Sequence, residues 1–344
     1  MLPLAVRLLL QVMIFAGIGE LALRLDEETG VFQGGARLEN RPKPSAELLA
    51  VKAGTYTPPA DQFRVMLLGD SYLFGAGVPD GETFAHRLRQ SLSARNPGGL
   101  ATASLLDLTM PGSNTFTNTQ AFHQARDLYR PHLAILAYNA NDVYGRMEEK
   151  GPAKAAATPA PAAAAAEADR GLNTVVAIRR VLYQSKLLQF ALIKLNMELK
   201  LRGIVLPGSE FDHQVNQSHA AGYPGWRKSQ DHLRRLAEAC RERGIHLIVV
   251  NVPELNMLSH RQPFQKMDAE IKRFFTTLAD VTYLDGAQPF LARPVGDPKE
   301  YAISKHDGHP NAKAHQVLAE FVYQATLERV PRLTSAAAAV PAVR

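Results

Sequence analysis

The stretch that decides the fold is Val65-Met66-Leu67-Leu68-Gly69-Asp70-Ser71-Tyr72-Leu73-Phe74-Gly75. Its four leading apolar residues are too few for an independent helix and suit a strand that is buried on both faces. Gly69 allows a sharp turn, and Ser71 follows where a helix would begin. A serine there lies above the sheet edge with backbone N–H groups nearby, which is a suitable place for a nucleophile. A plain turn with a helix cap explains the same tripeptide without any chemistry.

Further apolar runs predict a sheet around this strand. Strands are expected at residues 63–68, 104–108, 133–138, 245–252 and 281–285, and helices near 82–94, 120–128, 224–243, 264–279 and 311–329. Strands that alternate with helices through right-handed crossovers predict an α/β fold, a three-layer sandwich with a five-stranded parallel sheet. The site of such a sheet lies beyond the carboxyl ends of its strands. Ser71, Gly112 and Asn141 all follow predicted strands and are therefore expected at that edge.

Composition narrows the function classes. The chain has 344 residues, and its 39 Lys and Arg against 33 Asp and Glu give a net charge of +6. The basic residues are scattered and no aromatic–basic stripe appears, so we expect no nucleic-acid partner and a solvated basic surface instead. Cys240 is the single cysteine, which excludes an intrachain disulfide and a zinc–cysteine site and suits a small buried helix residue. The sequence implies no cofactor and no metal.

The first 25 residues are read as an N-terminal membrane anchor or signal segment. Residues 8–25 are apolar apart from Gln11, Glu20 and Arg24, with Arg7 ahead of them. A transmembrane anchor with its positive end inside and a cleaved export signal both fit this pattern. An amphipathic helix of a soluble protein is the third alternative. Either of the first two predicts export, with the catalytic domain held on the extracytoplasmic side of the membrane or secreted.

The rest of the chain divides by composition. Residues 26–60 lack periodicity and are expected to be a connector, and residues 333–344 a disordered Ala-rich tail. The domain at 61–332 is interrupted at 151–209 by an Ala/Pro-rich linker (152–168) and a helical insert (172–202). That insert is either an accessory hairpin packed on the domain, a lid over the site, or a membrane-surface helix.

A candidate base lies in the loop before the last helix, Ser304-Lys305-His306-Asp307-Gly308-His309-Pro310-Asn311. Asp307 can reach Nδ1 of His309 within this loop and would leave Nε2 free to take a proton. A helix cap by Asp307 or Asn311 is the structural alternative. Two further alternatives are His306 as the base and a metal site made of His306, Asp307 and His309, for which no other ligand cluster is evident.

Four segments of the sequence together resemble the conserved blocks of the SGNH, or GDSL, hydrolase superfamily. They are Leu68–Gly75, Met110-Pro111-Gly112-Ser113-Asn114, Asn141-Asp142 and Asp307-Gly308-His309-Pro310-Asn311. The resemblance covers about residues 61–330 and implies a flavodoxin-like fold, with Ser71, Asp307 and His309 as the catalytic residues. It implies that an oxyanion hole is made by the N–H groups of Ser71 and Gly112 and by the side chain of Asn141. Asp70 is expected to hold the turn.

Two departures from the family pattern affect the expected site. The third block usually has a glycine two residues before its asparagine, and Asn139 stands there, although asparagine tolerates left-handed backbone angles. The last block often spaces its acid three residues before the histidine, where this chain has His306. The shorter spacing keeps Asp307 as the acid.

The resemblance implies a serine hydrolase that cleaves acyl esters, O-acetyl esters included. Its partners would be an acyl-ester substrate, an acylated glycan among the choices, and the membrane through the N-terminal segment. One alternative is an O-acyltransferase acting on an envelope polysaccharide. Another is a catalytically silent glycan-binding protein of the same fold.

Overall fold

The computed structural model describes residues 44–95, 100, 102–143, 186–292 and 300–337. These residues divide into two compact units. Residues 44–143 and 203–337 make one unit, which contains the sheet, and residues 186–202 belong to the other, which contains helix α7 (Lys186–Leu201). All candidate site residues lie in the first unit.

The first unit is built on a five-stranded parallel sheet, as predicted. Its strands are β1 (Gln62–Leu68), β2 (Thr102–Asp107), β3 (Leu133–Tyr138), β4 (His246–Asn251) and β5 (Val281–Asp285), in the order β2-β1-β3-β4-β5. β1 pairs with β2 on one side and with β3 on the other, through Leu67 opposite Asp107 and Leu68 opposite Leu136. The carboxyl ends of these three strands therefore meet at one edge.

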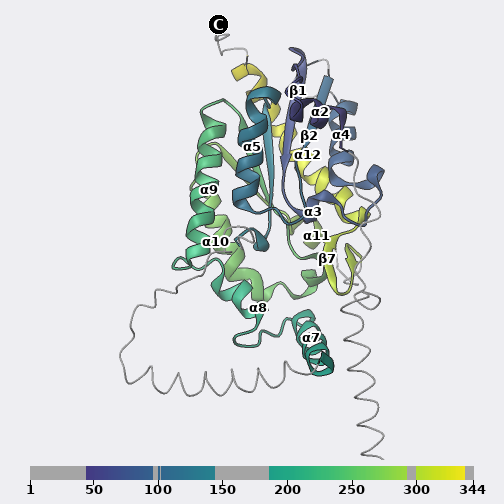
Figure 1. Ribbon diagram of the computed structural model, residues 1–344, viewed down its shortest axis with the longest axis vertical. Helices are drawn as coiled ribbons and strands as arrows, with labels where there is room; N and C mark the ends of the chain where they lie inside the picture. The colour runs from purple at the N-terminus through teal and green to yellow at the C-terminus, as the bar shows by residue number, and fades with distance from the viewer. Residues whose placement is uncertain (1–43, 96–99, 101, 144–185, 293–299, 338–344) are drawn as a thin grey trace, which may run out of the picture. The chain divides into compact units, whose positions relative to one another are not determined.

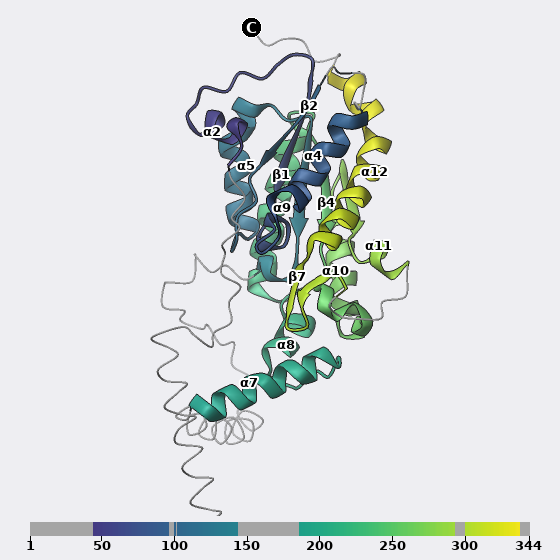
Figure 2. The ribbon, with the colours of Figure 1, turned by 90° about the vertical axis from the view of Figure 1, so that its right-hand side faces the viewer.

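Helices cover both faces of the sheet, which makes the three layers visible in Figures 1 and 2. One face carries α4 (Phe84–Arg95), α11 (Gln288–Leu291) and α12 (Ala312–Ala337), and the other α5 (Thr115–Tyr129), α9 (Pro224–Arg241) and α10 (Gln265–Thr276). Val65 and Leu67 share a buried cluster with Leu88 of α4 and Leu318 of α12. Because side chains alternate along a strand, Met66 of β1 faces the other layer, and it is also fully buried. A strand buried on both faces is what its unbroken apolar run predicts.

Short elements complete the unit. They are α2 (Ala46–Lys52), α3 (Ser71–Phe74), α8 (Glu210–Asp212), the 3-10 turns Asp80–Glu82, Ala140–Val143, Leu255–His260 and Gln262–Phe264, a π-turn at His213–Gln217, and an antiparallel hairpin of β6 (Ala302–Ser304) and β7 (Asp307–Pro310). Two of the helices differ from expectation. α2 lies within the predicted connector, where Ser45 caps it by accepting a hydrogen bond from the Leu48 N–H. α12 continues to Ala337 and so includes residues 333–337, which the sequence assigns to the tail.

Other expectations concern residues that the structure covers only in part. The N-terminal segment 1–25 and the Ala/Pro-rich linker 152–168 lie outside the described residues, so the anchor and export stay predictions. α7 corresponds to the second half of the predicted helical insert. No helix in the described ranges is both long and apolar enough to cross a bilayer. Cys240 is buried on α9, as expected, and burial raises the pKa of its thiol to about 12.

Candidate active site

The turn after β1 presents Ser71 as the first residue of α3. Gly69 permits the turn because its backbone passes close to β3: a Cβ on Gly69 would lie only 2.9 Å from the Cβ of Ala137. Asp70 caps the helix, since its Oδ1 accepts a hydrogen bond of 2.9 Å from the Tyr72 N–H. Asp70 is thus the structural residue that the sequence predicts, and Ser71 projects from a fixed turn.

Ser71, His309 and Asp307 form a continuous hydrogen-bonded chain. The Ser71 Oγ lies 2.9 Å from Nε2 of His309, and Nδ1 of His309 lies 2.5 Å from Oδ1 of Asp307. An ionised carboxylate can only accept, so Nδ1 carries the proton and donates it to Asp307. Nε2 is then left to accept the Ser71 hydroxyl proton. Residues 238 positions apart are therefore joined in the order hydroxyl, imidazole and carboxylate, the order of a serine–histidine–aspartate triad.

The β6–β7 hairpin holds Asp307 and His309. Asn311, directly after β7, donates from Nδ2 to the carbonyl groups of Glu300 and Ala302, and its Oδ1 accepts from the Ala314 N–H at the start of α12. Asn311 is therefore the residue that caps the helix. Asp307 is left to accept hydrogen bonds from both Nδ1 and the backbone N–H of His309.

The contacts in this hairpin do not support either alternative role of His306, as the base or as a metal ligand. Asp307 bonds to His309, and the His306 N–H donates to the Ser304 hydroxyl. Within the described ranges, no group of three or more His, Cys, Asp or Glu side chains is placed to hold a metal ion.

The two partners change each other's pKa. The hydrogen bond from His309 lowers the pKa of Asp307 below its usual value, against the effect of burial. Burial lowers the pKa of His309, but the hydrogen bond and negative charge of Asp307 outweigh it. The charges of Asp70 and Glu254 add to that effect, and the pKa of His309 ends raised. The imidazole is therefore a stronger base than an isolated histidine.

The asparagine that replaces the expected glycine connects two parts of the site. Asn139 donates from Nδ2 to Oδ2 of Asp70 (2.7 Å), and its Oδ1 accepts from the N–H of Asn141 (2.7 Å). Its own N–H donates to Asp142 (3.0 Å). Asn139 is not among the described residues with positive φ, so it needs no left-handed conformation. The departure from the family pattern thus supplies a side chain that ties the Ser71 turn to the Asn141 loop, a role that sequence reasoning missed.

Gly112 and Asn141 follow the two strands that flank β1. Gly112 belongs to a turn in which the Ser113 N–H donates to the Met110 carbonyl, and its φ of 79° is a conformation that favours glycine. Asn141 lies in the 3-10 turn after β3. Since the sheet order is β2-β1-β3, these two residues come from the loops on either side of the Ser71 turn. Both residues are exposed.

A model of a known family matches most of the chain. Residues 67–317 match the GDSL-like Lipase/Acylhydrolase family. No curated protein sequence matches the chain. Similar solved structures include a lipase/acylhydrolase from Enterococcus faecalis, with 10% identity, a TM-score of 0.43, and coverage of 78% of this chain and 97% of that one. A mutant of the acetyl-xylooligosaccharide esterase Axe2 from Geobacillus Stearmophilus has 12% identity, a TM-score of 0.44, and coverage of 76% and 93%.

The family match extends over most of the chain and spans the Ser71 turn, the Gly112 turn, the Asn141 loop and the β7 hairpin. The family match is a third line of evidence for the family, besides the five-stranded parallel sheet and the serine–histidine–aspartate geometry. The chain belongs to the GDSL-like lipase/acylhydrolase family and is a hydrolase that acts on ester bonds.

Proposed function

We propose that this protein hydrolyses acyl esters, O-acetyl esters included, by a Ser-His-Asp mechanism. The 2.9 Å contact between Ser71 Oγ and His309 Nε2 carries the proposal, because it joins a nucleophile to a base of raised pKa. His309 takes the hydroxyl proton as Oγ bonds to the ester carbonyl carbon. It then protonates the departing alkoxide, and the same base activates the water that releases the acyl group from Ser71.

The negative charge on the carbonyl oxygen needs hydrogen-bond donors. We assign this role to the N–H groups of Ser71 and Gly112 and to the side-chain amide of Asn141. Ser71 begins α3, so its N–H has no acceptor within that helix. The Asn141 backbone N–H is taken by Asn139, while no side-chain hydrogen bond of Asn141 joins it to another described residue. Its amide is therefore available to a substrate oxygen.

Replacing Asn141 with alanine tests the oxyanion hole. We expect kcat for p-nitrophenyl acetate to fall by roughly a hundredfold or more, because one lost oxyanion donor raises the barrier by about 3 kcal/mol. The melting temperature should hardly change, since Asn141 is exposed. Asn216→Ala is the matched control: this exposed asparagine donates to Asp212, which is not one of the candidate site residues. An unchanged kcat in Asn141→Ala would remove that residue from the site.

The Asp307–His309 pair predicts a specific pH dependence. His309 acts as a base only when neutral, so kcat/KM rises as pH rises through its pKa, which Asp307 raises. In Asp307→Asn the negative charge is gone, the pKa of His309 falls, and the acid limb of the profile should move to lower pH. The plateau should drop by about 10⁴-fold, because the amide group of asparagine can donate to Nδ1 and so favours the wrong tautomer of the imidazole. The measurement is the profile of kcat/KM from pH 4 to 9.

Asp231→Asn is the control for this profile, because Asp231 is an exposed aspartate paired with Arg234 on α9. This variant should have the same acid limb and the same plateau value of kcat/KM as the wild type. An acid limb that stays in place in Asp307→Asn would mean that another group governs the activity at low pH.

A further inference from the structure

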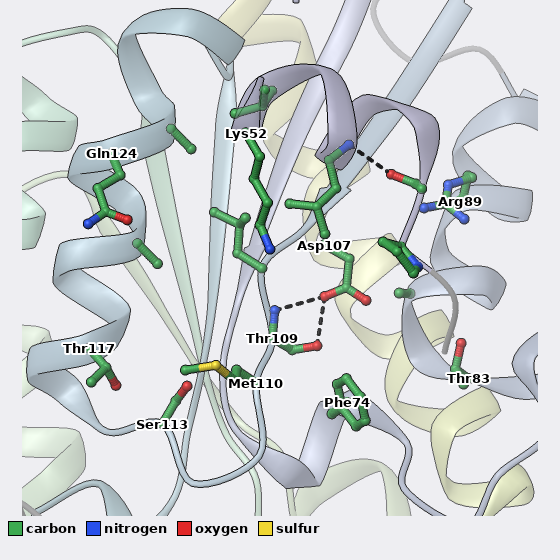
Figure 3. Close-up of a pocket in the computed structure, with 18 of the residues that line it drawn as sticks. Lys52, Phe74, Thr83, Arg89, Asp107, Thr109, Met110, Ser113, Thr117 and Gln124 are labelled. Carbon is green, nitrogen blue, oxygen red and sulfur yellow. Dashed lines mark hydrogen bonds between the residues drawn. The ribbon is translucent and has the colours of Figure 1, made fainter. Parts of the chain in front are cut away.

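A cavity of about 920 Å³ lies beside the candidate active site, between α2, α4, α5 and the end of β2 (Figure 3). This volume is typical of a small-molecule site. The cavity shares walls with the catalytic region. Phe74, one helical turn after Ser71 on α3, lines it, as do Met110 and Ser113 on either side of Gly112. A group held there is therefore close to the turns that carry the nucleophile and an oxyanion donor.

Several polar groups in the cavity have hydrogen-bonding atoms that no other described residue occupies. Oδ1 of Asp107 accepts both hydrogen bonds from Thr109, at 2.9 and 2.7 Å. Its Oδ2 has no hydrogen-bond partner among the described residues, nor do the side chains of Lys52 and Gln124. Figure 3 shows Lys52 extending from α2 into the pocket on the side where Asp107 and Thr109 lie. Arg89 uses one of its donors on the Leu105 carbonyl. The cavity thus offers donors and acceptors from four different elements, α2, α4, α5 and β2.

The charges that line the cavity balance. Lys52 and Arg89 are positive, and Asp80 and Asp107 are negative, so the lining favours neither an anion nor a cation. An alkyl chain would leave these polar groups without hydrogen bonds once it displaced their water. Apolar surface is nevertheless present between them, from Leu48, Val51 and Leu128. A ligand with hydroxyl groups and C–H faces, and no net charge, suits such a mixture.

We infer that this cavity is the subsite for the carbohydrate part of the ester substrate, a neutral oligosaccharide. The inference rests on the proposed ester hydrolysis and adds the class of alcohol from which the acyl group is removed. Sugar hydroxyls can donate to the free oxygen of Asp107 and accept from Lys52 and Gln124. The C–H face of a ring can pack on the apolar surface of α2.

The double variant Lys52→Met/Gln124→Leu tests this subsite. Both side chains are exposed, and the hydrogen bonds that hold Asp107 come from Thr109, so the turn that leads to Gly112 is preserved. Three esters are compared: O-acetylated cellotetraose, p-nitrophenyl acetate and glycerol monodecanoate. We expect the ratio of kcat/KM for the sugar ester to that for p-nitrophenyl acetate to fall about tenfold or more, as the loss of two hydrogen bonds implies. Lys228→Met/Gln324→Leu, exposed on α9 and α12, is the matched control and should keep the wild-type ratio.

The outcomes separate the two proposals. A change confined to glycerol monodecanoate would make the cavity an acyl-chain site, and unchanged ratios for all three esters would show that it binds no part of the substrate. Either result overturns the carbohydrate subsite while leaving ester hydrolysis intact. If the wild type cleaves no ester at all, the proposed function fails. Calorimetric titration of Ser71→Ala with O-acetylated cellotetraose then decides the subsite alone: binding that the double variant abolishes supports it, and no binding overturns it.

Discussion

Replacing Ser71 with alanine should lower ester hydrolysis by roughly 10⁴- to 10⁶-fold, the effect seen when a serine hydrolase loses its nucleophile. The expected loss is this large because Ser71 Oγ forms the bond to the acyl group, and no other hydroxyl among the described residues is hydrogen-bonded to His309. The change removes one oxygen from a half-buried position, so the fold should be kept. The measurement is kcat/KM for p-nitrophenyl acetate together with labelling by a fluorophosphonate probe.

Ser93→Ala is the matched control, because Ser93 is exposed on α4 and alanine is a good helix former. It should hydrolyse and label like the wild type. Mapping of the labelled wild-type peptide should place the adduct on Ser71. Labelling that persists in Ser71→Ala would identify a different nucleophile and end the proposed mechanism.

Replacing His309 with alanine should have a similar effect, although Ser71 remains in place. Without Nε2 at 2.9 Å, nothing takes the hydroxyl proton, so both hydrolysis and fluorophosphonate labelling should fall by roughly 10³-fold or more. The double variant Ser71→Ala/His309→Ala should be no slower than Ser71→Ala alone, because residues that act as a unit are not additive.

His123→Ala controls for the loss of a histidine, since His123 is exposed on α5. Its rates should match the wild type. Circular dichroism and melting temperature show whether each variant is folded. A folded His309→Ala protein that still labels rapidly would show that Ser71 is activated by another base.

The sheet could be predicted because its signal is local. The run Leu133 to Tyr138 is apolar throughout, and a short apolar run bounded by polar residues admits few structures other than a doubly buried strand. Strand order and the meeting of Ser71 with its flanking loops then follow from general rules of parallel sheets. The short helix α3 is harder to predict from the sequence, because its four residues are too few to show a helical periodicity.

The positions of Asp307 and His309 in a hairpin could not be predicted in the same way. β7 has no apolar alternation, and its glycine is fixed by a distant neighbour: a Cβ on Gly308 would lie 2.6 Å from Oδ1 of Asn256. The bridging role of Asn139 was equally hidden, because its partner Asp70 lies 69 residues away. Such contacts exist only after the chain has folded.

The cavity also escaped prediction, because one of its walls is α2. Residues 26–60 contain several prolines and glycines, which hides the seven-residue helix capped by Ser45. A helix that short is not stable alone and forms here because it packs against α5 and β2.

The order of the elements along the chain has a consequence for synthesis. The nucleophile turn and all five strands of the sheet are complete by Asp285, whereas the base arrives only with the β7 hairpin. A growing polypeptide on the ribosome that has completed its sheet therefore carries a serine that cannot yet react. The hairpin is followed by α12, in which His315 accepts a hydrogen bond from the Phe84 N–H at the start of α4. Esterase activity during translation would thus appear late and abruptly. Its appearance would indicate that α12 has packed onto α4 in the first half of the domain.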